Sequence, residues 1–127
     1  MGRILNFHLP AADVERAVAF YRDVFGWKFT SLSDGGVPYF HASAEGIGVE
    51  AAITARTSIV AHPVPTIEVD DIDNTLARLA ITGGQQGAVN DIPGIGRFAY
   101  ARDSEGNTIA LLQRDVSSTA PGGVASP

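Results

Sequence analysis

One pattern occurs twice in this chain, and this internal repeat constrains the fold more than any other feature of the sequence. The segment "NFHLPAADVERAVAFYRDVFGW" aligns with "VPTIEVDDIDNTLARLAITGGQ", which matches Asp13 to Asp71 at an offset of 58 residues (71 − 13 = 58). An "EG" pair recurs later in each copy, and there Glu50 matches Ala110 at an offset of 60 (110 − 50 = 60). The chain of 127 residues is therefore expected to contain two copies of one supersecondary unit.

Each copy is predicted to fold as one strand, one helix and three further strands. Asp13 and Asp71 stand at N-cap positions, and apolar residues follow at helical spacing over residues 14–25 and 72–81, with glycines after both segments. Alternation and turn signals predict strands at 4–10, 27–32, 37–42 and 47–53 in the first copy and at 64–69, 85–89, 96–102 and 107–113 in the second. The expected fold is α+β, with two tandem βαβββ modules whose curved mixed sheets enclose one cavity.

The two modules are expected to form a single domain over residues 1–114. Module one covers residues 3–54, a polar linker that contains proline covers 55–63, and module two covers 64–114. Residues 115–127 are small, polar and rich in Pro and Gly. Such a segment buries too little apolar surface to become ordered, so we predict a disordered tail.

Composition excludes several classes of function. The absence of Cys excludes disulfides, thiolate metal sites and cysteine nucleophiles. A net charge of −5, with nine scattered Lys and Arg residues, argues against nucleic-acid binding. No apolar run approaches the roughly 18 residues of a membrane-spanning helix, and the N-terminus does not resemble a signal peptide. We therefore expect a cytoplasmic protein with no membrane contact.

The period of two along each strand predicts which side chains face a ligand. In the first strand Leu5, Phe7 and Leu9 should pack on the helix, because they share one apolar face. The residues predicted to line the opposite, concave face are Ile4, Asn6, His8, Gly48, Glu50 and Ala52 in module one, and Val64, Thr66, Glu68, Thr108, Ala110 and Leu112 in module two.

Three motifs resemble those of a known family. They are Asp13 with "ERAVAFYRDVFGW", the "VDDID" entry to the second helix, and "IPGIGRFAYARDSEGNTIALLQ" near the end. Together they make residues 3–114 similar to the vicinal oxygen chelate superfamily, which includes glyoxalases, bleomycin-resistance proteins and extradiol dioxygenases, and above all to its small two-module bacterial members. The resemblance implies a shared ligand cavity and favours a homodimer.

In the metal-dependent members of that family, the first and last strands of each module supply the ligands of one divalent ion. The corresponding positions in this sequence are Asn6, Glu50, Val64 and Ala110. Two of these residues have no donor atom, and a neutral amide is a poor ligand for Zn, Ni or Fe. We therefore expect no metal or other cofactor. A displaced metal site that uses His8 and Glu50 is the alternative, whereas His41 and His62 are weaker candidates.

Without a metal, Glu50 and His8 are the candidate catalytic residues. Apolar walls formed by Val64, Ala110 and Leu112 would desolvate the Glu50 carboxylate, raise its pKa and suit it to proton transfer, with His8 as its partner. The structural alternative is that Glu50 only satisfies a polar patch, through hydrogen bonds to Asn6, Thr66 or water.

Six aromatic residues are predicted in the outer strands, where their rings either stack on a planar ligand or fill the core. Tyr39, Phe98 and Tyr100 are the preferred ligand contacts, because they lie near the glycine-rich segment 91–97, a candidate flap. The other three are Trp27, Phe29 and Phe40.

Two functions follow from these observations. The first is a metal-free protein that binds a small organic molecule, aromatic or antibiotic-like, as bleomycin-resistance proteins do. The second is a lyase, isomerase or dioxygenase that uses a remodelled metal site or the Glu50/His8 pair, so the sequence leaves open whether the protein is an enzyme. The predicted ligand contacts are Asn6, His8, Tyr39, Glu50, Val64, Thr66, Phe98, Tyr100 and Ala110.

Overall fold

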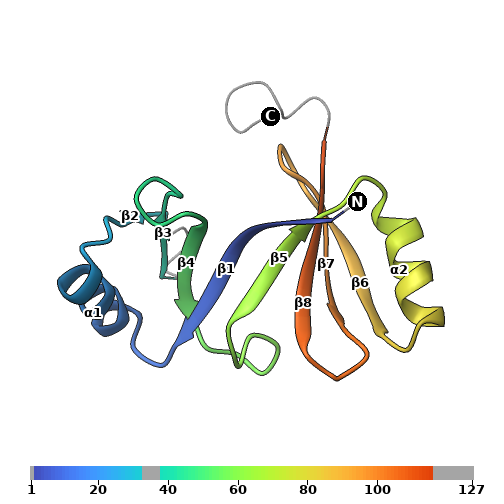
Figure 1. Ribbon diagram of the computed structural model, residues 1–127, viewed down its shortest axis with the longest axis horizontal. Coiled ribbons are helices and arrows are strands. Elements are labelled where there is room, and N and C mark those ends of the chain that lie inside the picture. The colour runs from blue at the N-terminus through green and yellow to red at the C-terminus, as the bar shows by residue number, and fades with distance from the viewer. Residues whose placement is uncertain (1, 33–37, 116–127) are drawn as a thin grey trace. The chain divides into compact units, whose positions relative to one another are not determined.

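A computed structural model describes residues 2–32 and 38–115, which contain two helices and eight strands (Figure 1). Tertiary contacts divide the chain into two compact units. The first unit is Leu5–Pro65, and the second combines Met1–Ile4 with the chain from Thr66 onward. The first residues of the chain therefore belong with the second repeat rather than with the first.

The first unit contains helix α1 (Val14–Phe25) beside a sheet with the strand order β2-β3-β4-β1. The strands are β1 (Arg3–Ala11), whose first two residues belong to the second unit, β2 (Thr30–Ser31), β3 (Tyr39–Ala42) and β4 (Glu50–Ala55). Strand β1 pairs with β4 in parallel, with Asn6 opposite Glu50, whereas β3 is antiparallel to β2 and β4.

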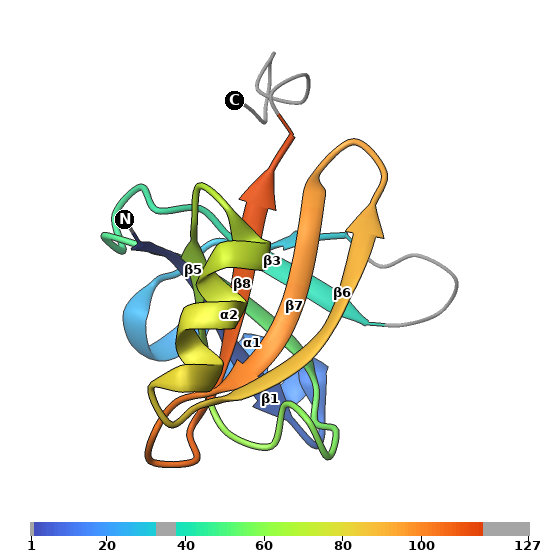
Figure 2. The same cartoon turned by 90° about the vertical axis from the view of Figure 1, so that its right-hand side faces the viewer.

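The second unit repeats this arrangement with helix α2 (Ile72–Ile81) and the strand order β5-β8-β7-β6. The strands are β5 (Val64–Glu68), whose first two residues belong to the first unit, β6 (Gln85–Ile92), β7 (Gly96–Arg102) and β8 (Thr108–Arg114). Strand β5 pairs with β8 in parallel, with Thr66 opposite Ala110, and β7 is antiparallel to β6 and β8. Figure 2 shows α2 lying across one face of this sheet. The α+β class and the two βαβββ units are thus confirmed.

Both helices begin at the predicted caps. The Asp13 carboxylate accepts a hydrogen bond from the Arg16 amide at 3.0 Å, and the Asp71 carboxylate accepts one from the Asn74 amide at 3.1 Å. These bonds satisfy amides that have no partner inside the helix. Helix α1 ends at Gly26, whose φ of 75° is the left-handed conformation that glycine adopts most readily.

Each helix buries its apolar stripe against its own sheet. In the first unit Val14 and Val18 of α1 pack with Ala11 and Ile53, and in the second unit Ile72 and Leu76 of α2 pack with Leu111 and neighbouring residues. Leu9 and Ile67 join these cores, as the alternation of their strands predicts. The sheet face opposite each helix, called here the open face because no helix of its own unit covers it, carries the candidate site.

Three expected strands differ from the structure by three residues at one end, and the others by at most two. Strand β4 begins at Glu50 rather than at residue 47, because the amides of Ile47 and Gly48 both bond back to the Ala44 carbonyl and form a turn. Strand β2 contains only two residues, so Trp27 and Phe29 lie outside it. Strand β6 continues to Ile92 instead of ending at residue 89.

Further predictions concern the segment 91–97, the turns and the C-terminal tail. The segment 91–97 is not one loop: it forms the ends of β6 and β7 with a tight turn, in which the Ile95 amide bonds to the Ile92 carbonyl, and its role as a flap stays a prediction. The predicted "SDGG" turn and the tail after Asp115 lie outside the described residues. Enclosure of one cavity by the two sheets stays a prediction. No helix in the described part of the chain is long and apolar enough to cross a membrane.

Candidate functional site

Polar side chains gather on the open face of the first unit. Asn6 and His8 alternate along β1, and the register places them opposite Glu50 and Ala52 of β4. His41 of β3 lies opposite Ala52 on the other side of β4. Because side chains of paired residues share a face, Asn6, His8, His41 and Glu50 project from the same side of the sheet.

Glu50 is hydrogen-bonded to His41, a partner that the sequence does not reveal. The Glu50 Oε1 and His41 Nε2 atoms are 3.1 Å apart. The Glu50 side chain is 47% exposed and that of His41 is 28% exposed, so the expected burial of Glu50 is wrong in this structure. His41 and Tyr39 are two residues apart, so their side chains share a face, and the pairing of His41 with Ala52 determines which face that is.

His8 contacts an aromatic ring instead of a carboxylate. Its imidazole meets the Tyr39 ring edge-on, with the ring centroids 6.3 Å apart. Burial lowers the pKa of His8 below its usual value of 6.5, because the charged form loses hydration, so the ring is neutral at pH 7. The Nδ1 atom of His8 and the Oδ1 atom of Asn6 are buried and have no hydrogen-bond partner among the described residues.

The open face of the second unit is more apolar. Thr66, Ala110 and Tyr100 lie side by side on β5, β8 and β7, and Phe98, two residues before Tyr100, lies on the same face. The rings of Phe98 and Tyr100 meet edge-on at 5.0 Å, and burial raises the pKa of the Tyr100 phenol. Thr66 is 2% exposed, and its hydroxyl has no hydrogen-bond partner among the described residues. The aromatic pair thus lies beside one unsatisfied hydroxyl.

At one end of this face, Glu68 is held by two arginines. Its carboxylate oxygens lie 2.9 Å from Nε of Arg3 and 3.3 Å from Nε of Arg114. These two ion pairs hold the Glu68 carboxylate at the end of the face.

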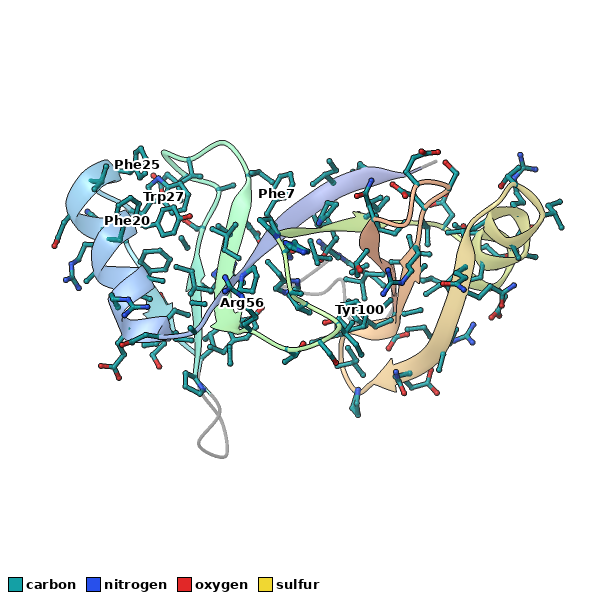
Figure 3. All side chains as sticks on the ribbon, turned by 90° about the horizontal axis from the view of Figure 1, so that it is seen from below. Phe7, Phe20, Phe25, Trp27, Arg56 and Tyr100 are labelled. Carbon is teal, nitrogen blue, oxygen red and sulfur yellow. The ribbon has the colours of Figure 1, made fainter. Side chains whose placement is uncertain are left out.

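The remaining predicted aromatic contacts belong to the helix side of the first sheet. Phe29 and Phe40 pack against the core under α1, and Trp27 stacks on Tyr21 with the ring centroids 4.9 Å apart. Figure 3 shows Phe20, Phe25 and Trp27 clustered beside that helix, and Tyr100 in the second unit. Trp27, Phe29 and Phe40 are therefore packing residues in the first unit.

The residues at the family's metal positions do not fit a divalent ion. Val64 and Ala110 have no donor atoms, and Asn6 offers only an amide. No three His, Cys, Asp or Glu side chains gather where they could hold a metal in residues 2–32 and 38–115. His62, the other histidine considered, follows β4 in the connection to β5. Glu50 and His41 thus form a pair rather than a complete ligand set.

Comparisons with known proteins agree with this architecture. The family model "bleomycin resistance protein-like N-terminal" matches residues 3–40. A glyoxylase-like domain-containing protein from Didymella fabae is 33% identical over 123 residues, in an alignment that covers 89% of this chain and 94% of the relative.

Solved structures of low sequence identity share the fold. Methylmalonyl-CoA epimerase from Mycobacterium tuberculosis has a TM-score of 0.67 at 16% identity, covering 90% of this chain and 89% of the epimerase. A hypothetical protein from Bacillus halodurans has a TM-score of 0.68 at 10% identity, covering 90% of this chain and 95% of that protein. With its repeated βαβββ units and its glyoxylase-like relative, the chain belongs to the vicinal oxygen chelate superfamily.

Proposed function

We propose that the protein binds a small organic molecule on the open face of β1, β3 and β4 without a divalent metal. The observation that carries this proposal is the pair of buried, unpartnered atoms, Asn6 Oδ1 and His8 Nδ1. Each such atom costs about 1–3 kcal/mol when it has no partner. Native proteins contain few of them, so two on neighbouring positions of one strand indicate groups that a ligand satisfies.

The surrounding residues define the chemistry of that ligand. Asn6 Oδ1 and the Glu50 carboxylate accept hydrogen bonds, so the ligand should carry N–H or O–H donors. The Tyr39 ring, which meets His8 edge-on, offers an aromatic surface beside them. An aromatic or antibiotic-like molecule with polar substituents fits this combination, and the match to a bleomycin-resistance family model supports the same class.

Thermal melts with bleomycin, and with small aromatic amides and alcohols, test the proposal. A binder should raise the melting temperature in proportion to the logarithm of its concentration once it is saturating. Asn6→Leu should abolish that shift and at the same time stabilise the free protein, because it replaces an unsatisfied amide by an apolar group of similar size. If Asn6→Leu instead destabilises the free protein and leaves ligand shifts intact, Asn6 has only a structural role.

A second candidate function, proton transfer, rests on the bond between Glu50 and His41. A carboxylate oriented by an imidazole at 3.1 Å can accept a proton from a carbon next to a carbonyl group, while the electrons of the C–H bond move into the enolate. The fold shared with methylmalonyl-CoA epimerase makes an acyl thioester a suitable first substrate to test.

Exchange of the substrate's α-hydrogen in D2O, followed by NMR, measures this activity directly. If Glu50 is the base, Glu50→Gln should remove exchange and leave ligand-induced stabilisation in place. Wild-type protein that stabilises with methylmalonyl-CoA yet catalyses no exchange would be a binding protein only.

A further inference from the structure

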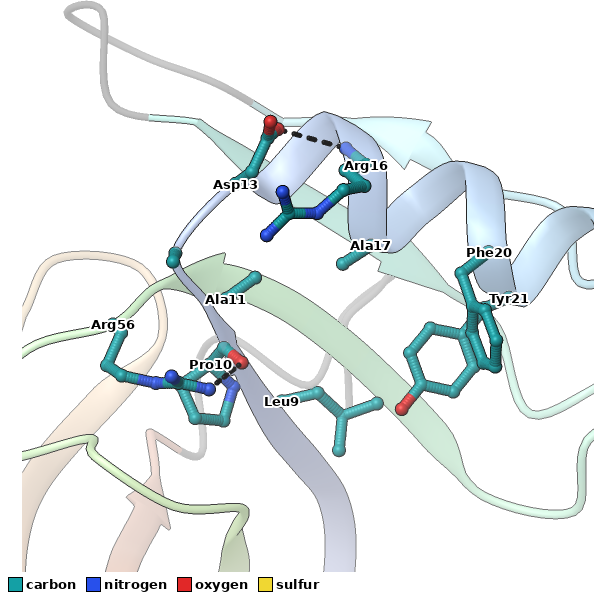
Figure 4. A pocket seen from close by; sticks show the side chains of 10 residues that line it. Leu9, Pro10, Ala11, Asp13, Arg16, Ala17, Phe20, Tyr21 and Arg56 are labelled. Carbon is teal, nitrogen blue, oxygen red and sulfur yellow. Dashed lines mark hydrogen bonds between the residues drawn. The ribbon is translucent and has the colours of Figure 1, made fainter.

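A cavity lies beside helix α1 of the first unit, and neither Asn6 nor Glu50 lines it. It has a volume of about 400 Å³ and occupies the space between the end of β1 and the first two turns of α1 (Figure 4). Every residue that lines it belongs to the unit Leu5–Pro65. The volume falls within the usual range for small-molecule sites.

Two arginines face this cavity with unused hydrogen-bond donors. The Arg56 guanidinium donates one bond to the Pro10 carbonyl at 3.2 Å, and the Arg56 amide bonds to the Ala11 carbonyl at 3.0 Å. These two bonds hold Arg56 across the end of β1 and leave most of its N–H groups free. Among the described residues, the Arg16 guanidinium has no hydrogen bond or ion pair.

The one carboxylate in the same cavity can offset only one of these two cations. Asp13 uses Oδ1 to accept the Arg16 amide at 3.0 Å, as the cap of α1. With the Arg16 amide satisfied in this way, the guanidinium groups of Arg16 and Arg56 are the cations that an incoming anion would meet in the cavity. The polar end of the cavity therefore has an excess of positive charge.

The other end of the cavity is aromatic and aliphatic. Figure 4 shows the rings of Phe20 and Tyr21 beside Leu9, at the end away from Arg56. Phe20 is 54% exposed although it is a large apolar side chain, and its ring meets the Tyr21 ring edge-on at 5.2 Å. An exposed ring beside a half-buried one offers a stacking surface for a second planar group.

We propose that this cavity is a binding site for a small aromatic carboxylate. The carboxylate group would lie between Arg16 and Arg56, and the aromatic body would cover Phe20 and Tyr21. This site is separate from the open face, and it does not require Glu50, His41 or Asn6.

Titration with 3-phenylpropionate, with the uncharged isostere 3-phenylpropionamide as a control, tests the proposal. Trp27 is the only tryptophan of the chain and stacks on Tyr21 at 4.9 Å, so its fluorescence reports on a ligand in the cavity. We expect the acid to saturate with a Kd of about 1 mM or below and the amide to bind at least about tenfold more weakly. Absence of saturation up to about 20 mM, or equal binding of acid and amide, would overturn the proposal.

Three arginine variants locate the site. Arg16→Gln and Arg56→Gln should each weaken 3-phenylpropionate binding by about fivefold to tenfold. Arg22→Gln is the matched control, because Arg22 lies on the same helix, pairs with Asp23 and does not line the cavity. Equal losses in all three variants would indicate only a general charge effect and would contradict the assignment.

Two more measurements distinguish this site from the open face and from a simple anion site. Glu50→Gln should leave the affinity for 3-phenylpropionate unchanged, and a loss in that variant would place the ligand on the open face instead. Inorganic phosphate should compete only weakly, since it cannot use the rings. If phosphate binds as tightly as the aromatic acid, the aromatic half of the proposal is wrong.

Discussion

Nε2 of His41 lies 3.1 Å from Oε1 of Glu50, although the two residues belong to different strands, β3 and β4. The register pairs His41 with Ala52, two residues beyond Glu50, so the bond runs diagonally across the open face. On the other side of β4, Glu50 and Asn6 are direct neighbours in the register. The carboxylate therefore lies between a bound imidazole and an unpartnered amide oxygen.

This bond should contribute little to stability. Both side chains are partly exposed, and exposed ion pairs typically contribute about 0.2–1 kcal/mol. We expect a double-mutant cycle of His41→Gln and Glu50→Gln, measured by urea unfolding, to give a coupling free energy below about 1 kcal/mol. A coupling of several kcal/mol would show that the pair is primarily structural.

Wild-type protein should show no stabilisation by divalent metals, whereas Asn6→His should acquire it. The substitution places an imidazole opposite Glu50, which is itself hydrogen-bonded to His41, so that two histidines and one carboxylate share this face. Bound metal at about one hundred times its Kd adds about 2.7 kcal/mol, seen as a rise of the melting temperature with Zn²⁺ or Ni²⁺. Asn6→Leu is the control, and an equal rise in wild-type protein would refute the expected absence of a metal.

The contribution of the α2 cap to the stability of the protein should be measurable by chemical unfolding. Asp71→Ala removes the acceptor of the Asn74 amide and should lower the free energy of unfolding by about 1 kcal/mol. Asp71→Asn keeps an oxygen at the same position and should cost much less. Similar losses in both variants would mean that the charge, rather than the hydrogen bond, stabilises the helix.

Gly87 should tolerate no side chain, because its backbone lies against β7. A Cβ atom at this position would lie 2.0 Å from the Tyr100 carbonyl oxygen. Gly87→Ala should therefore destabilise the second unit by about 1–3 kcal/mol in chemical unfolding. Gly94→Asn is the matched control: the space around it is open, and asparagine accepts its left-handed φ of 78°. Comparable stability of Gly87→Ala and wild type would contradict the close approach.

Acidification should destabilise the protein through His8. Burial lowers the folded-state pKa of His8 below 6.5, so below pH 6.5 the unfolded chain binds more protons than the folded one. The contribution of His8 to the free energy of unfolding is therefore fully present above pH 6.5 and decreases as the pH falls below that value. His8→Gln should flatten that part of the curve of melting temperature against pH. An unchanged slope, or an NMR titration of His8 at or above 6.5, would exclude this role.

Local signals predicted the helices well. Asp13 and Asp71 cap their helices through bonds to amides three residues later, a relationship contained entirely in the local sequence. The glycines at 46 and 48 indicated a turn, but they did not reveal that the turn continues to residue 49 and delays β4. That boundary depends on the bonds to the Ala44 carbonyl.

The partner of Glu50 could not be predicted in the same way. The alternation of β1 correctly predicted the open face, because a nine-residue strand has a clear period. Strand β3 has only four residues, so the facing of His41 is fixed by its pairing with Ala52 of β4 rather than by its own sequence. The unpartnered state of Asn6 Oδ1 and His8 Nδ1 likewise depends on tertiary packing.

The parallel pairings have a consequence for how the chain assembles. Asn6 precedes Glu50 by 44 residues, and Thr66 precedes Ala110 by the same 44 (50 − 6 = 110 − 66 = 44). Closing such loops costs entropy that neighbouring hairpins do not lose, so β3 with β4, and β7 with β8, are the kinetically favoured pairs. During synthesis, β1 therefore leaves the ribosome long before β4, the strand with which it pairs, and β5 leaves it long before β8.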